Sequence, residues 1–207
     1  MQRSPLIELV SVHHEGRCGA VLRDATLQIW PGETVAIRAS AGAGKTTLLR
    51  ILAGLVSPSQ GTRAADGSVG AGGVAFLSQR PSFLLTLTAV EHVMVGLLAK
   101  GLRDQARVRE RAMQGLLAAG LAHMAATSMR QLCGAERRLV LVAEMLALGA
   151  PLVFVDEGYG ASVAKLASPE RTLVLVARET IAMRVDRWLH IDAHGSVHAL
   201  VTADAAA

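Results

Sequence analysis

The sequence predicts an α/β fold in which a mainly parallel sheet is flanked by helices. Hydrophobic residues make up 51% of the 207 residues and aromatic residues only 3%, so Leu, Val and Ala must build the core. That mixture suits parallel strands covered by helices. An apolar strand at residues 34–37, a glycine-rich loop and a helix at residues 45–55 follow one another directly. A chain of this length is typical of one domain, which we expect over residues 1–207.

Two strands are expected near the N-terminus, at residues 6–13 and 20–29, because apolar and polar side chains alternate there. We expect them to form an antiparallel β subdomain. Residues 60–73 are Gly-rich and carry no strong periodic signal, whereas residues 74–77 predict a short buried strand.

Apolar residues recur at three- and four-residue intervals from Thr88 to about Ala126, which predicts a helical insert over about 81–131. A further helix and four strands are predicted after it, the helix at 135–148 and the strands at 152–155, 172–176, 188–191 and 196–201.

Charge and cysteine content limit the possible partners. The net charge of +4 comes mostly from scattered arginines without a lysine-rich block, so no nucleic-acid partner is expected. Cys18 and Cys133 match no metal spacing, which indicates a reducing, cytoplasmic compartment. The most apolar stretch, residues 139–155, is interrupted by a glutamate, a glycine and a proline, so we expect no membrane span.

A phosphate loop is the firmest motif. Residues 39–46 match the pattern G-x-x-x-x-G-K-S/T, with Ala39 in place of the first glycine. Small residues let backbone N–H groups curl around phosphate oxygens at a helix N-terminus, although a plain helix-capping turn is the alternative interpretation. Lys45 would neutralise the β- and γ-phosphates of ATP, and Thr46 would join a Mg²⁺ shell. The expected nucleotide-binding residues are Ser40, Ala41, Gly42, Ala43, Gly44, Lys45, Thr46 and Thr47.

Two carboxylates follow the apolar strand at residues 152–155, at the strand end where open α/β sheets bind ligands. Asp156 suits the Mg²⁺ shell, and Glu157 suits a base for an attacking water.

With these motifs in this order, nearly the whole chain resembles the ATPase subunits of ABC transporters. Gln79 takes the position of the family's Q-loop glutamine, which implies contact with Mg²⁺ and the attacking water. Residues 132–139 lie where the family has its L-S-G-G-Q signature. The resemblance implies that Cys133, Gly134, Ala135 and Glu136 approach a nucleotide bound by an opposite subunit, in a homodimer or heterodimer.

Several positions depart from the family pattern. Cys133 and Ala135 replace a serine and a glycine of the signature, and Cys133 is the weaker donor. Residues 157–163 lack the D-loop aspartate, and Arg178 occupies the place of the switch histidine. No Tyr or Trp occupies the place of the adenine-stacking aromatic, for which His14, or His13, is the nearest candidate.

The resemblance implies an ATP-binding and ATP-hydrolysing subunit that powers a separate membrane permease, on the cytoplasmic face of the cell membrane. We expect the docking surface to include four apolar residues beside Gln79, namely Phe83, Leu84, Leu85 and Leu87. One alternative is a degenerate subunit that binds ATP with little turnover and pairs with a competent partner. Another is a soluble P-loop ATPase unrelated to transport.

Overall fold

A computed structural model describes residues 4–16, 19–67, 69, 73–177 and 183–200. The chain divides into two units, the first formed by residues 1–76, 151–157 and 167–207 and the second by residues 77–150 and 158–166. The helical insert expected over about 81–131 falls within the second unit. Among the described residues, no helix is both long and apolar enough to cross a bilayer.

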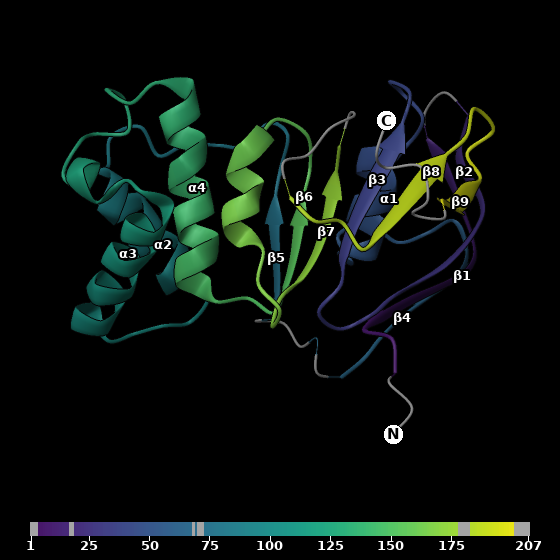
Figure 1. The fold of residues 1–207 in the computed structure, drawn as a ribbon, viewed down its shortest axis with the longest axis horizontal. Helices are drawn as coiled ribbons and strands as arrows, with labels where there is room; N and C mark the ends of the chain where they lie inside the picture. The colour runs from purple at the N-terminus through teal and green to yellow at the C-terminus, as the bar shows by residue number, and fades with distance from the viewer. Residues whose placement is uncertain (1–3, 17–18, 68, 70–72, 178–182, 201–207) are drawn as a thin grey trace. The chain divides into compact units, whose positions relative to one another are not determined.

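The first unit is built on a six-stranded sheet. Its strand order is β5-β6-β7-β3-β8-β9. The strands are β5 (Val74–Leu77), β6 (Leu152–Val155), β7 (Thr172–Val176), β3 (Thr34–Ala39), β8 (Arg187–Ile191) and β9 (Val197–Leu200). The pairs β6–β7, β7–β3 and β3–β8 are parallel, and β9 closes the edge as an antiparallel strand. Every residue of β6 and β7 is buried, which explains their continuous apolar sequences and confirms the predicted sheet (Figure 1).

A separate three-stranded antiparallel sheet confirms the predicted β subdomain. Its order is β2-β1-β4, with β1 at Ile7–Gly16 and β2 at Gly19–Ile29. The third strand, β4 (Gln60–Ala65), lies in the Gly-rich residues 60–73, where the sequence carries no strong periodic signal and no strand was predicted. Its side chains are almost all exposed and show no apolar alternation, so the strand forms through backbone pairing with β1. Arg63 adds hydrogen bonds from Nε and Nη2 to Leu52 O, at 3.0 and 2.8 Å.

Helix α1 (Lys45–Leu52) joins the cores of the two sheets. Leu48, Leu49, Ile51 and Leu52 are fully buried in one apolar cluster with residues of both sheets. The helix ends earlier than the predicted residue 55 because the chain turns at Gly54, and Leu55 is 60% exposed. The buried face of α1 therefore holds the first residue of the helix, Lys45, in place relative to both sheets.

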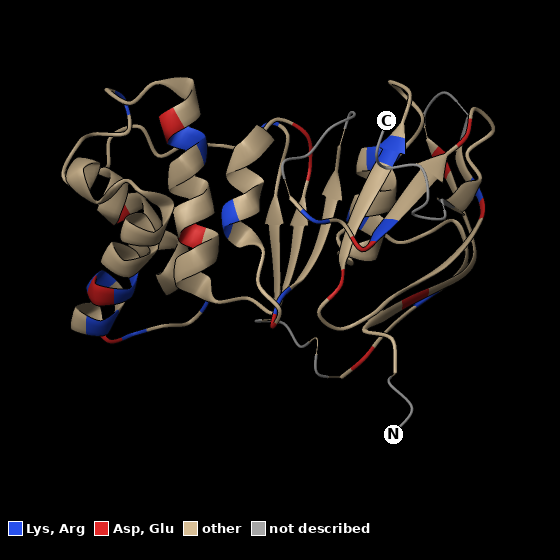
Figure 2. Cartoon of the chain, viewed as in Figure 1, with Lys and Arg blue, Asp and Glu red and all other residues tan. Residues whose placement is uncertain are grey.

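The second unit is helical. The predicted continuous stretch is divided into α2 (Ala89–Ala99), α3 (Gln105–Ala119) and the short η1 (Ala122–Met124), followed by α4 (Gly134–Leu148) and η2 (Gly160–Leu166). Side-chain caps set the boundaries, since Glu91 Oε2 accepts from Thr88 N at 2.8 Å and Asp104 Oδ1 accepts from Ala106 N at 3.0 Å. Basic and acidic residues are interspersed on these helices (Figure 2).

A buried acid lies between α2 and α4. A β-carbon at Gly96 would collide with the carboxylate of Glu144, so the glycine makes room for this side chain. Glu144 Oε2 lies 3.8 Å from His92 Nδ1, and the two side chains are 17% and 7% exposed. Burial raises the pKa of Glu144 to about 7, against the opposing charge of Lys100, and burial lowers the pKa of His92. Both shifts favour the neutral form of each side chain.

We expect Glu144→Gln to stabilise the protein more at pH 8 than at pH 5. The pKa of Glu144 is higher in the folded chain than in the unfolded chain, so wild type loses stability as pH rises from about 4.5 to about 7. The loss is bounded at roughly 3 kcal/mol, and the amide does not titrate. Urea denaturation at a series of pH values measures the difference between the two proteins.

The lowered pKa of His92 acts in the opposite direction, because the protein loses stability as pH falls below the ordinary pKa of histidine. This contribution is the same in wild type and in Glu144→Gln. Glu110→Gln on the exposed surface of α3 serves as a control and should show little pH-dependent difference from wild type. A constant difference between Glu144→Gln and wild type across this range would contradict the assignment.

Candidate functional site

The phosphate loop connects β3 to α1 in the first unit. Its crest, Ser40 to Gly42, is exposed, and both Gly42 and Gly44 have left-handed backbones with φ of +84° and +88°. Gly44 is the N-cap of α1 and has no side chain to accept from the N–H groups of the first turn. Together with the helix dipole, these N–H groups favour an anion at this position.

Lys45 is buried at the base of the loop. Its Nζ donates to the carbonyl oxygens of Ala39 at 3.0 Å and Ser40 at 2.9 Å. It also lies 3.3 Å from Glu157 Oε1, and the two side chains are 10% and 14% exposed. The structure therefore brings the predicted phosphate-binding lysine and the predicted base into one ion pair.

Thr46 and Asp156 form the second contact between the loop and the acids. Thr46 Oγ1 donates to the Asp156 carboxylate, at 3.0 Å from Oδ2 and 3.2 Å from Oδ1. Asp156 is 2% exposed at the end of β6, and Oδ1 also accepts from Glu157 N at 2.9 Å. The parallel arrangement of β3, β7 and β6 explains this meeting, because carboxyl ends of parallel strands lie at one edge of a sheet.

These oxygen donors fit a magnesium ion. A hydroxyl and a carboxylate in direct contact are hard ligands, and Mg²⁺ is commonly held by one or two carboxylates together with substrate phosphates. Among the described residues, no group of three or more His, Cys, Asp or Glu side chains is arranged to hold a metal. The site thus suits a metal that arrives with a phosphate ligand, with Thr46 and Asp156 as its protein contacts.

His14 lies one strand away from the loop. It pairs with Leu22 in the β1–β2 hairpin, and a β-carbon at Gly44 would lie 3.5 Å from Leu22 Cδ2. Within the described chain, its buried Nδ1 makes no hydrogen bond. His13 instead pairs with Gln60 of β4. Because the hairpin lies close to the loop, His14 stays the candidate for contact with the adenine ring.

The other predicted site residues lie in the second unit. Gln79 is exposed just beyond the end of β5. Cys133 is an exposed free thiol that precedes α4, with Gly134 and Ala135 exposed in its first turn. Glu136 Oε2 accepts from Cys133 N at 2.7 Å, so its carboxylate caps the helix. Arg178 and Cys18 lie outside the described residues.

Sequence reasoning did not identify the carbonyl groups that hold Lys45, nor Tyr159. Tyr159 is buried, at 4% exposed, and its Oη donates to the carbonyl of Ser78 at 2.9 Å. Backbone acceptors leave no signal in a sequence. The tyrosine, in contrast, is the single one in the chain and lies between two glycines after Glu157, which could have marked it.

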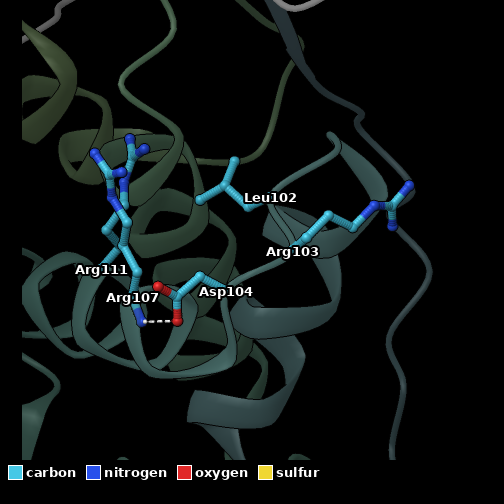
Figure 3. Close-up of a pocket in the computed structure, with 5 residues that line it drawn as sticks. All are labelled: Leu102, Arg103, Asp104, Arg107 and Arg111. Atoms are coloured by element: carbon cyan, nitrogen blue, oxygen red, sulfur yellow. Dashed lines mark hydrogen bonds between the residues drawn. The ribbon is translucent and has the colours of Figure 1, made fainter.

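A pocket of about 300 Å³ lies in the second unit (Figure 3). Its lining consists of Leu102, Arg103, Asp104, Arg107 and Arg111. Asp104 Oδ1 accepts from Arg107 N at 3.2 Å, and Arg111 Nη2 donates to Ala147 O at 2.7 Å. Asp104 and Arg111 therefore stabilise helix ends, and the pocket contains none of the predicted nucleotide-site residues.

Comparison with known proteins agrees with this geometry. The sequence profile of the family described as ABC transporter matches residues 22–159. The taurine import ATP-binding protein TauB of Pseudomonas aeruginosa is 34% identical over 157 residues, which cover 73% of this chain and 59% of that protein. The aliphatic sulfonates import ATP-binding protein SsuB of Granulibacter bethesdensis is 30% identical over 214 residues, which cover 96% of this chain and 84% of that protein.

Solved structures extend the comparison to the fold. The dimeric structure of a post-hydrolysis state of the ATP-binding cassette MJ0796, bound to ADP and Pi, is 25% identical. It superposes with a TM-score of 0.78 and covers 93% of this chain and 96% of that one.

We expect Gly44→Ala to destabilise the protein more than Gly42→Ala. Both positions are left-handed, which costs an L-residue about 1–2 kcal/mol. Only at Gly44 would the new β-carbon also meet a backbone atom, Val21 O at 2.9 Å, whereas at Gly42 nothing lies within 4 Å. Free energies of unfolding from urea titrations measure both variants. Equal losses would show that the hairpin does not constrain the loop.

Proposed function

The chain belongs to the ABC transporter family, and from that membership we propose that it binds ATP, hydrolyses it and powers a separate membrane permease. The observation that carries the proposal is the contact of Lys45 and Thr46, at the start of α1, with Glu157 and Asp156, at the end of β6. If the loop were only a turn that caps α1, the buried ion pair between Lys45 and Glu157 would have no explanation. A phosphate site with a metal contact and a base accounts for all four side chains.

ATP binding is assigned to the loop and to Lys45. The backbone N–H groups of the loop, whose residues 40–42 are exposed, and those of the first turn of α1 would surround the phosphates, as the helix dipole favours. Lys45 would exchange its bonds to Ala39 and Ser40 for phosphate oxygens, which are better partners for an ammonium group. His14 is proposed to contact the adenine ring.

Hydrolysis is assigned to Glu157, as base for the attacking water, and to Gln79, which would orient that water. Mg²⁺ bound with ATP would neutralise charge on the phosphates, with Thr46, Asp156 and Gln79 in its shell. The carboxylate of Glu157, with Oε1 3.3 Å from Lys45 Nζ, is the group that would accept the proton of the attacking water. When Lys45 turns to the phosphates, the carboxylate becomes available to the water.

A second ATP-binding subunit is proposed as partner. Cys133, Gly134, Ala135 and Glu136 would face the nucleotide of that subunit from the start of α4, where the dipole favours phosphate. The dimeric cassette with ADP and Pi among the similar structures supports this arrangement. Closure of two subunits around ATP, and reopening after hydrolysis, would move the permease between its states.

A degenerate subunit is the second candidate function. Cys133 is a weaker donor than serine, and the capping bond occupies the Glu136 carboxylate. Low turnover is also indicated by three other departures from the family pattern, namely Ala135, Arg178 and the missing D-loop aspartate. Such a subunit would bind ATP with little turnover beside a competent partner. Family membership weakens the third interpretation, a soluble P-loop ATPase unrelated to transport.

We expect Glu157→Gln to retain Mg-ATP binding and to lower the hydrolysis rate by about 10²–10³-fold, because only the base is lost. Lys45→Ala should instead abolish tight binding. Nucleotide titration and phosphate release, with Glu110→Gln as a surface control, measure both effects. Equal residual rates for wild type and Glu157→Gln would support the degenerate subunit. Binding unaffected by Lys45→Ala would contradict the phosphate site itself.

The permease is proposed to dock on the apolar residues that follow Gln79, and thereby to hold the chain on the cytoplasmic face of the membrane. Leu84 is 45% exposed and Leu85 37% exposed, on a segment fastened by a hydrogen bond from Ser128 Oγ to Leu85 O at 3.2 Å. Phe83 and Leu87 complete the proposed surface. Exposed leucines on an ordered turn are suited to burial by a partner.

Replacing Leu84 and Leu85 together by serine should abolish co-purification with a detergent-solubilised permease that recovers with the wild-type chain, while Mg-ATP binding persists. Leu117→Ser is the matched control, since Leu117 is a 67% exposed leucine on α3 of the same unit. Co-purification that survives the double substitution, or is lost equally with Leu117→Ser, would argue against this docking surface.

A further inference from the structure

Tyr159 joins two segments of the second unit that lie far apart in sequence. Its Oη donates to Ser78 O at 2.9 Å, and the side chain is only 4% exposed. A buried hydroxyl needs such a partner, and a buried carbonyl gains one. The bond therefore fixes the distance between the chain at residue 159 and the chain at residue 78.

The bond acts on the peptide unit of Gln79. The accepting carbonyl of Ser78 shares its peptide plane with the N–H of Gln79, so its direction sets the orientation of that plane. On the other side, Ser78 Oγ accepts from Arg80 N at 3.4 Å. Gln79 thus lies in a turn whose entry is held by Tyr159 and whose exit is closed by Ser78.

The local chain directs Tyr159 inward. It lies between Gly158 and Gly160, whose φ values of +106° and +49° produce a sharp reversal two residues beyond Glu157. A β-carbon at Gly158 would lie 3.5 Å from the guanidinium carbon of Arg138 on α4. Ser162 N donates to Tyr159 O at 3.1 Å, which closes the turn into η2. Tyr159 is therefore held in a turn of the second unit by its own carbonyl as well as by its hydroxyl.

We propose that Tyr159 is a positioning residue for hydrolysis, which fixes the orientation of the peptide unit of Gln79. The inference rests on the proposed function, because it needs Gln79 to act on the attacking water. Small displacements of a group that orients a reactant reduce rates strongly, whereas binding of the bulk of a substrate is hardly altered. The hydroxyl of Tyr159 therefore acts on turnover and not on nucleotide affinity.

Tyr159→Phe tests the role because it keeps the buried ring and removes the hydroxyl alone. We expect kcat for Mg-ATP hydrolysis by the full chain to fall about tenfold, with KM and Mg-ATP affinity within about twofold of wild type. Hydrogen exchange at residues 78–80 should become faster. Replacement of Tyr159 by 4-aminophenylalanine, which keeps a donor at the same place, should restore most of the rate.

Thr172→Val is the matched control. Thr172 is 1% exposed in β7 of the first unit, and its hydroxyl accepts from Gly32 N at 2.8 Å. This variant also loses one buried hydroxyl bound to the backbone, so its melting temperature should fall by a similar amount. Its kcat should stay at the wild-type value, which separates positioning from lost stability.

A double-mutant cycle with Gln79→Ala shows whether Tyr159 acts through Gln79. In the Gln79→Ala background, Tyr159→Phe should change kcat by less than twofold, since residues that act as one unit are not additive. A full tenfold loss in that background, or equal kcat for wild type and Tyr159→Phe, would overturn the positioning role alone. A wild-type chain that binds Mg-ATP without hydrolysing it would remove the proposed turnover, and this role with it.

Discussion

Burial of α1 is the constraint on which the candidate site depends. Four of its eight residues are completely buried in a core shared by both sheets of the first unit, so a rotation or shift of the helix would expose apolar side chains. Its first residue, Lys45, is therefore fixed at the end of β3. Parallel pairing from β3 through β7 to β6 then brings Asp156 and Glu157 to the same place. Apolar packing thus determines where the candidate site forms, and the side chains of Lys45, Thr46, Asp156 and Glu157 determine its chemistry.

The parts that sequence could predict are those with a local or periodic signal. The strand, loop and helix around Lys45 form one continuous pattern, and Asp156 and Glu157 follow an unmistakable buried strand. β4 could not be predicted, because pairing with β1 supplies its structure while its exposed side chains follow no pattern. The division of the helical stretch did carry a local signal, since Gly101 has a left-handed backbone and Asp104 is the N-cap of α3, and the apolar periodicity on both sides masked it.

The start of α4 shows that a fold can persist where a motif changes. Glu136 caps the backbone of Cys133, so the helix begins at the family's position although the signature serine is absent. Cys133 and Ala135 therefore change the side chains of this segment, while the helix still begins directly after Cys133. Fold comparison is insensitive to such changes, which is why the similarity to solved cassettes coexists with an altered signature.

The discontinuity of the first unit has a consequence for the order of folding. Its sheet takes β3 from residues 34–39 and β6, β7 and β8 from beyond residue 151, whereas residues 77–150 of the second unit are continuous. Contacts close in sequence form faster than distant ones, because less chain entropy is lost in closing the loop. During synthesis the helices can thus associate while β3 still lacks both its neighbours. The phosphate loop, which is made early, acquires its shape only when the last parallel strands arrive.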